Sequence, residues 1–264
     1  GMTSLSANTT GDHNVAVGVS ALALNTTANS NTAVGFEALC KNTTGSNLTA
    51  VGAYALDANT TGASNTAISG GALTKNTTGD FNVAVGTNAL CTNVTSDSNT
   101  AVGYFALRLN TGASNTAVGL CSLEANTTGT SNVAIGFEAS RLNTEGTGNV
   151  AVGYEALDAN TTGGVNVAVG YRALKVNTTA GNNVAIGYAS LQANTTGTCN
   201  TAVGTNALLA NTTATGNTAV GMNSLDANTE GFNNTAVGNC SGSGITTGDC
   251  NTFVGAFAAY TATT

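Results

Sequence analysis

One short phrase of polar and apolar residues returns along the whole chain. The phrase Asn-Thr-Ala-Val-Gly, or a copy with one or two changes, first begins at Asn14 and last ends at Gly255. An apolar Ala-Leu pair and a polar Asn-Thr-Thr-Gly segment follow it, and the consensus reads N-T/V-A-V/I-G-x-x-A-L-x-x-N-T-T-G-x-x. The opening Asn returns every 17 residues, although Leu48 replaces it once and the stretch NTGAS at 110–114 is one residue short. Such a period predicts one structural unit per repeat, stacked so that neighbours complete its core.

The residue types of the repeat favour strands and turns over helix. Each copy carries β-branched Thr and Val, Asn and at least one Gly. We therefore predict an all-β fold, a parallel β-solenoid (β-roll or β-helix) with one 17-residue repeat per coil and about fifteen coils. Each coil should hold a strand at T-A-V, a turn at Gly, a second short strand around A-L and a turn through N-T-T-G.

The two ends of the chain differ in this pattern. We expect a continuous repeat array over residues 1–250, and a terminal capping coil and tail at 251–264, where Phe253, Phe257 and Tyr260 form an apolar plug. The stretch 1–11 matches 221–231, so the chain starts within a repeat and we expect a longer parent chain. We see no cap at the N-terminal end, and an uncapped coil exposes unpaired backbone groups, so this end should continue into more protein, pair with another molecule as in an end-to-end polymer, or fray.

Two columns of Asn predict ladders between coils. A side-chain amide at the same place in every coil can donate to one neighbour and accept from the other. The ladder residues that we predict include Asn14, Asn31, Asn65, Asn82, Asn149 and Asn166 in the first column, and Asn42, Asn59, Asn160 and Asn177 in the second.

The apolar columns indicate how the coil packs. We expect Val and Leu, for instance Val152 and Leu157, to be buried in each coil. The position between Thr/Val and Val/Ile is Ala in every copy except at Phe253. Another surface must therefore pack closely against this Ala face. That surface is either the opposite wall of a thin solenoid or another chain.

Composition narrows the classes of function. Only 7% of residues are charged, the net charge is −7 and there are six Lys and Arg residues, which argues against nucleic acid as a partner. No apolar run reaches 18 residues, so we expect no membrane insertion. His13 is the only histidine and the Asp residues are scattered among columns, so we predict no metal, no cofactor and no catalytic site.

An aromatic column offers a surface for binding. Phe137, Tyr154, Tyr171 and Tyr188 follow the Gly of four consecutive coils. They form either a stacked ladder that stabilises the coils or a strip that binds carbohydrate or a neighbouring chain.

Three modifications or alternative functions also follow from the sequence. The glycosylation rule N-x-S/T is met at ladder positions including Asn8, Asn59, Asn160 and Asn211, although an Asn engaged in a ladder cannot carry a glycan. Cys240 and Cys250 lie in one coil and could form a disulfide. Regular Thr columns on a β-solenoid could bind ice, but Glu145, Glu230 and Val94 interrupt them.

The phrase N-T-A-V-G, with its variants NVAIG at 132–136 and 183–187, resembles the S-V-A-I-G motif of trimeric autotransporter adhesin heads. The whole unit is similar to repeat arrays of phage and virus tail-fibre proteins. The resemblance implies a left-handed solenoid, a homotrimer and a place on a cell or virion surface. Our hypothesis is therefore a structural, non-enzymatic extracellular rod, the shaft or binding segment of a fibre, adhesin or self-assembling filament. Its expected partners are further copies of the chain, in a homotrimer or an end-to-end polymer, and cell-surface carbohydrate. The alternative function is ice binding.

Overall fold

The computed structural model describes residues 1–261 of the chain, and these form fifteen strands of three residues each and no helix. The strands are β1 (Val15–Val17), β2 (Thr32–Val34), β3 (Thr49–Val51), β4 (Thr66–Ile68), β5 (Val83–Val85), β6 (Thr100–Val102), β7 (Thr116–Val118), β8 (Val133–Ile135), β9 (Val150–Val152), β10 (Val167–Val169), β11 (Val184–Ile186), β12 (Thr201–Val203), β13 (Thr218–Val220), β14 (Thr235–Val237) and β15 (Thr252–Val254).

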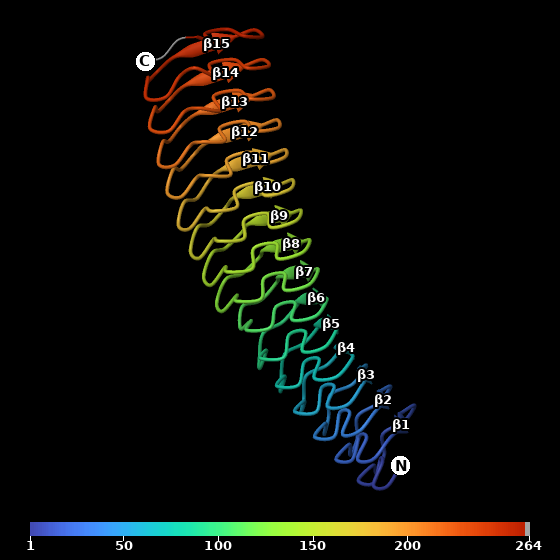
Figure 1. The fold of residues 1–264 in the computed structure, drawn as a ribbon. Coiled ribbons are helices and arrows are strands. Elements are labelled where there is room, and N and C mark those ends of the chain that lie inside the picture. The colour runs from blue at the N-terminus through green and yellow to red at the C-terminus, as the bar shows by residue number, and fades with distance from the viewer. Residues whose placement is uncertain (262–264) are drawn as a thin grey trace. The chain divides into compact units, whose positions relative to one another are not determined.

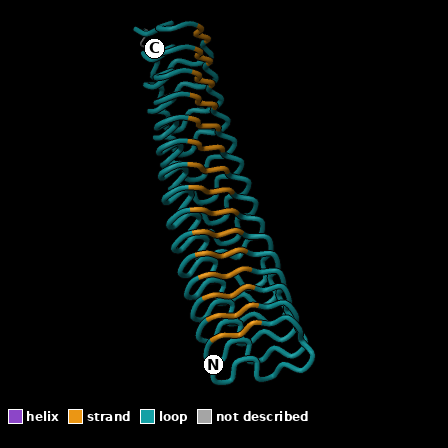
Figure 2. Tube along the Cα trace, turned by 90° about the vertical axis from the view of Figure 1, so that its right-hand side faces the viewer, coloured by secondary structure: helices purple, strands orange, loops and turns teal. Residues whose placement is uncertain are grey.

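The coils divide into two compact units, Gly1–Ser131 and Asn132–Thr264. Within the first unit, β1 to β7 pair in sequence order, and within the second, β8 to β15 do the same (Figure 1). All these pairs are parallel, and each residue faces its equivalent one repeat later, as Val150 faces Val167. In both units the strands lie along one side of the coils and turns make up the rest (Figure 2). The predicted parallel β-solenoid is confirmed.

The expected second strand around A-L is wrong, because this segment is a series of turns. In the coil that begins at Asn149, Glu155 and Leu157 have φ angles of 50° and 55°. These left-handed conformations bend the chain sharply and cannot continue a strand. The coils remain bonded here, since the N–H of Leu157 donates to the carbonyl of Ala173 in the next coil at 2.9 Å.

The core of each coil consists of Ala, Leu and Asn. Ala151, Ala156, Leu157 and Asn160 are all fully buried. The Ala face is therefore internal and packs against the opposite wall of its own coil, which decides between the two alternatives that the sequence left open. Val152 was expected in the core but is only partly covered on the outer face. The middle residue of each three-residue strand points inward and its two neighbours point outward.

The last coils compensate for one missing core side chain. Gly242 stands where other coils carry Leu, and a β-carbon added there would lie 2.9 Å from the side chains of both Leu225 and Phe253. Phe253 therefore occupies space next to Gly242, as expected for a residue of the plug. Phe257 and Tyr260 instead lie on the outside, 57% and 53% exposed, with their rings in edge-to-face contact at 5.6 Å. Of the expected capping segment, residues 262–264 lie outside the described residues.

Candidate functional site

The second Asn column forms a side-chain ladder inside each unit. The Nδ2 of Asn160 donates to the Oδ1 of Asn143 in the preceding coil at 2.7 Å, and the Oδ1 of Asn160 accepts from Asn177 at 2.9 Å. The second N–H of Asn160 donates to the carbonyl of Gly163 at 2.9 Å. The same pattern includes Asn42 and Asn59 in the first unit. These amides are fully buried and bonded on both sides, so hydrogen bonds within the protein take the place of hydrogen bonds to water.

The first Asn column joins successive coils mainly through the backbone, although the side-chain contact that we predicted also occurs, as from the Nδ2 of Asn166 to the Oδ1 of Asn149 at 3.2 Å. The Oδ1 of Asn149 accepts the backbone N–H of Asn166 at 2.9 Å, and its Nδ2 donates to Gly163 at 2.8 Å. The carbonyl of Gly163 thus accepts from both Asn columns of its repeat. The same backbone-to-side-chain contact joins the other predicted residues of this column, as for Asn14 with Asn31 and for Asn65 with Asn82.

The ladders break where the repeat departs from its consensus. In the shortened coil, Asn110 donates to Gly112 at 2.7 Å, and the buried Oδ1 of Asn93 has no donor. At the other end of the chain, Ile245 replaces the ladder Asn, and the Oδ1 of Asn228 also lacks a donor. A single missing residue or side chain therefore leaves a buried acceptor unsatisfied, at a cost of roughly 1–3 kcal/mol.

The outer face of the sheet is apolar. Its strands present Thr or Val at their first residue and Val or Ile at their last, and these side chains are partly or largely exposed. In the second unit, four strands in succession, β8 to β11, carry Val at the first residue as well. The most exposed outer residues in the interior coils of this unit include Ile135, Ile186, Val220 and Val237, each 37–40% exposed. We call this surface the outer sheet face.

The aromatic column is a stacked ladder. Phe137 lies over Tyr154 with ring centroids 5.2 Å apart, Tyr154 over Tyr171 at 5.1 Å, and Tyr171 over Tyr188 at 5.2 Å. The planes are within 8° of parallel. Because each ring face covers the next ring, the faces between these residues are closed to a sugar ring, and mainly the ring edges meet solvent.

A charged column beside the aromatic ladder was missed by the sequence analysis. Glu155 accepts from Arg172 at 2.7 Å and from Lys175 at 2.6 Å, and the guanidinium of Arg172 lies 5.0 Å from the centre of the Tyr171 ring. The hydrogen bond from Lys175 lowers the pKa of Glu155. The signal was available, since acids and bases alternate in the seventh and tenth positions of successive coils.

A second carboxylate of this column, Asp158, is nearly buried and pairs with Arg141 at 3.1 Å. Burial raises the pKa of Asp158, and Arg141 opposes that shift only in part. Arg108 and Glu124 also pair at 2.9 Å, so the charges of these paired residues are neutralised.

The predicted glycosylation and disulfide residues are placed as follows. Asn59, Asn160 and Asn211 are fully buried ladder residues, and Asn8 is half-buried at the first step of the ladder. The predicted disulfide is not formed, because Cys240 and Cys250 are both free thiols. Cys240 lies in the turn after β14, and its backbone N–H donates to the carbonyl of Met222 at 2.9 Å. Cys250 lies before β15, and its backbone N–H donates to the carbonyl of Phe232 at 2.9 Å.

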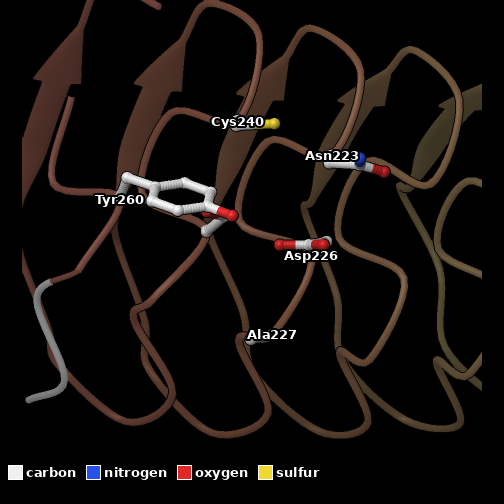
Figure 3. A pocket seen from close by; sticks show the side chains of 6 residues that line it. Asn223, Asp226, Ala227, Cys240 and Tyr260 are labelled. Atoms are coloured by element: carbon white, nitrogen blue, oxygen red, sulfur yellow. The ribbon is translucent and has the colours of Figure 1, made fainter. Parts of the chain in front are cut away.

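Two hollows lie on the turn side of the second unit. The larger, of about 450 Å³, is lined by Asn223, Asp226, Ala227, Cys240, Ser243 and Tyr260 (Figure 3). The smaller, of about 350 Å³, is lined by Val176, Gln192, Ala193, Leu209 and Ala210. The first is mostly polar and the second apolar. Neither hollow was predicted from the sequence, although the small residues at 241–244 signal a loss of side-chain volume.

Within residues 1–261 no three metal-binding side chains come together, and none of the described segments is a helix able to cross a membrane. The structure stacks Asn residues of successive coils as a side-chain ladder in the second column, and it stacks the rings of the aromatic column. Comparison of the chain with family models, with curated proteins and with solved structures gave no match.

Proposed function

We propose that this chain is a structural, non-enzymatic protein, the shaft or binding segment of an extracellular fibre, adhesin or self-assembling filament. The observation that carries the proposal is the buried Asn ladder, in which each coil depends on hydrogen bonds from both neighbours. Such a stack can lengthen coil by coil without a new core. Location at a cell or virion surface is supported by the resemblance of the repeat phrase to adhesin and tail-fibre arrays.

The partner that we favour is a second copy of the chain. The Ala face is internal and cannot form the contact, but the outer sheet face exposes Val and Ile from successive strands. Exposed apolar surface of this kind favours association, because burial releases about 25 cal/mol per Å². The homotrimer and the end-to-end polymer both remain proposals. The closed faces of the aromatic ladder speak against carbohydrate as the main partner.

Light scattering on a sizing column tests self-association. We expect the full chain to elute as an oligomer, and the double variant Val169→Lys, Ile186→Lys to elute as a folded monomer, because two charges would be buried in the contact. Thr179→Lys is the matched control, since Thr179 is exposed in the turn of the same coil as Val169. A wild-type monomer at micromolar concentration would contradict assembly through this face.

Ice binding is less well supported by the geometry. The first Thr of each N-T-T segment uses its hydroxyl within the protein, as when Thr161 donates to the carbonyl of Thr178 at 3.1 Å. Only the second Thr is freely exposed, and Glu145 and Glu230 interrupt its column. We therefore prefer the structural function, and ice crystals grown with a dilute sample should keep their normal shape.

A further inference from the structure

The larger hollow exists because one coil lacks side chains on its turn side. At the tenth position of the repeat, Asp226, Ser243 and Tyr260 follow one another in three successive coils. The middle coil contributes only the small residues Gly242, Ser243 and Gly244 around this point. Leu225 and Phe253 close the core side of the gap, and its outer side stays open as the hollow.

Asp226 lacks the cationic partner that Glu124 and Asp158 have in the same column. Its Oδ1 is buried and has no hydrogen-bond donor. Arg141 pairs with Asp158 and Arg108 with Glu124, but beside Asp226 the column supplies only Leu209 and Ser243. Burial raises the pKa of Asp226, and hydrogen bonds from the backbone N–H groups of Asp226 and Ala227 oppose that shift only in part. A positively charged group in the hollow would balance the charge of this carboxylate.

Tyr260 adds a second oxygen to the hollow. Its phenol oxygen points toward Asp226 (Figure 3), whereas the amide oxygen of Asn223, which lies in the same coil as Asp226, already accepts from Asn206 at 3.2 Å. An ammonium group has three N–H donors, and the hollow offers the carboxylate and the phenol oxygen as acceptors. The set suits a compact cation better than a metal ion, because Asp226 and Cys240 are the only strong metal ligands in the lining.

The smaller hollow extends this site with apolar surface. The backbone N–H of Ala210 donates to the carbonyl of Asp226 at 3.0 Å, so the coil that lines the end of the apolar hollow adjoins the coil of Asp226. Val176, Ala193 and Leu209 continue the same columns over the preceding coils. Each hollow has a volume typical of small-ligand sites, which run from about 300 to 1,000 Å³.

From this arrangement we infer that the turn side of the second unit binds a primary alkylammonium group. The ammonium lies against the carboxylate of Asp226, with the phenol oxygen of Tyr260 as a further acceptor. The alkyl chain lies over Leu209 and Ala210. The site does not depend on the proposed structural function, since a fibre segment and an unrelated module could both carry it.

Calorimetric titration of the full chain with n-hexylammonium chloride tests the inference. We expect one binding site per chain, and roughly tenfold weaker binding of hexan-1-ol, which keeps the alkyl chain and loses the charge. Asp226→Asn should weaken amine binding by roughly tenfold or more while leaving hexan-1-ol unchanged. Leu209→Ser should weaken both probes. Tyr260→Phe removes one acceptor and should reduce amine binding less than Asp226→Asn does.

Glu230→Gln is the matched control, because Glu230 is exposed in the same repeat as Asp226 and carries the same charge in a different turn. It should bind the amine as the wild type does. Equal binding of amine and alcohol, or unchanged amine binding by folded Asp226→Asn, would overturn the inference. Calcium or magnesium chloride displacing the amine in the wild type but not in Asp226→Asn would reassign the site to a metal ion.

Discussion

Asn160 and Asn143 lie one coil apart and are joined by a buried amide-to-amide hydrogen bond of 2.7 Å. Because Asn160 also accepts from Asn177, a disturbance at one ladder residue reaches the coils on both sides. Side-chain ladders of this kind hold identical segments in register without a large apolar core. Stability in this protein should therefore depend on buried amides as much as on the buried Leu column.

Asn160→Leu tests this dependence. The substitution removes three hydrogen bonds and leaves Gly163, Asn143 and Asn177 each with one contact fewer. We expect a loss of at least about 3 kcal/mol, since each buried polar group left unsatisfied costs roughly 1–3 kcal/mol. Thermal unfolding followed by circular dichroism measures the effect. Thr162→Val, at an exposed position two residues away, is the control, and equal melting temperatures for the two variants would refute the ladder argument.

Gly153 directly follows strand β9 with a φ of 136°, and a β-carbon there would collide with the backbone carbonyl of Gly170 in the next coil. Gly153→Ala should therefore destabilise the protein by several kcal/mol, about 3 or more, because neither backbone can move away without breaking coil contacts. Gly70→Ala provides the contrast. The nearest atom to a β-carbon at Gly70 is 3.9 Å away, so the melting temperature of the Gly70→Ala variant should equal that of the wild type or be slightly higher.

Glycosylation should be absent from the folded chain at Asn59, Asn160 and Asn211. Their side chains are fully buried and already bonded, and a glycan on any of them would prevent the coils from closing. Secretion from a eukaryotic host, followed by peptide mass mapping of the protease-resistant fraction, checks this. Detection of glycans at any of these three residues in folded material would contradict their placement in the ladder.

Tyr171 contacts an aromatic ring on each side and carries Arg172 over its face. Tyr171→Ala should cost about 1–3 kcal/mol, from two stacking contacts of roughly 0.5–1.5 kcal/mol each. Tyr171→Phe keeps the stack and should lose much less. Chemical denaturation of both variants measures the difference, and equal losses would mean that the phenol group, and not stacking, stabilises this column.

Asp226 should make stability fall as the pH rises. Its pKa is raised in the folded state by burial, so between the unfolded and folded pKa values the folded chain binds more protons than the unfolded chain. The free energy of unfolding then decreases as the pH rises through that window. Asp226→Asn should be more stable than the wild type at pH 7, and the difference should shrink below about pH 4, near the unfolded pKa of Asp. Thermal melts of both chains from acid to neutral pH supply the comparison.

Much of the fold could be read from the 17-residue period, because a repeat that aligns identical residues in successive coils specifies parallel pairing and register together. The Asn columns and the aromatic column followed for the same reason. The segment around Leu157 was misread as a strand, since Ala-Leu is compatible with extended backbone and only the closure of a small coil requires its positive φ.

The sequence by itself determined which residues recur and therefore which residues stack. Tertiary structure alone decided which side of the coil each column faces. Ala151 lies inside and Val152 outside because alternate residues of a strand point to opposite sides, and in this coil the middle strand residue faces the core. It also decided what surrounds Asp226, because the lack of a cation beside this carboxylate depends on side chains from three coils. Contacts between coils are set by packing in three dimensions, which a one-dimensional period does not specify.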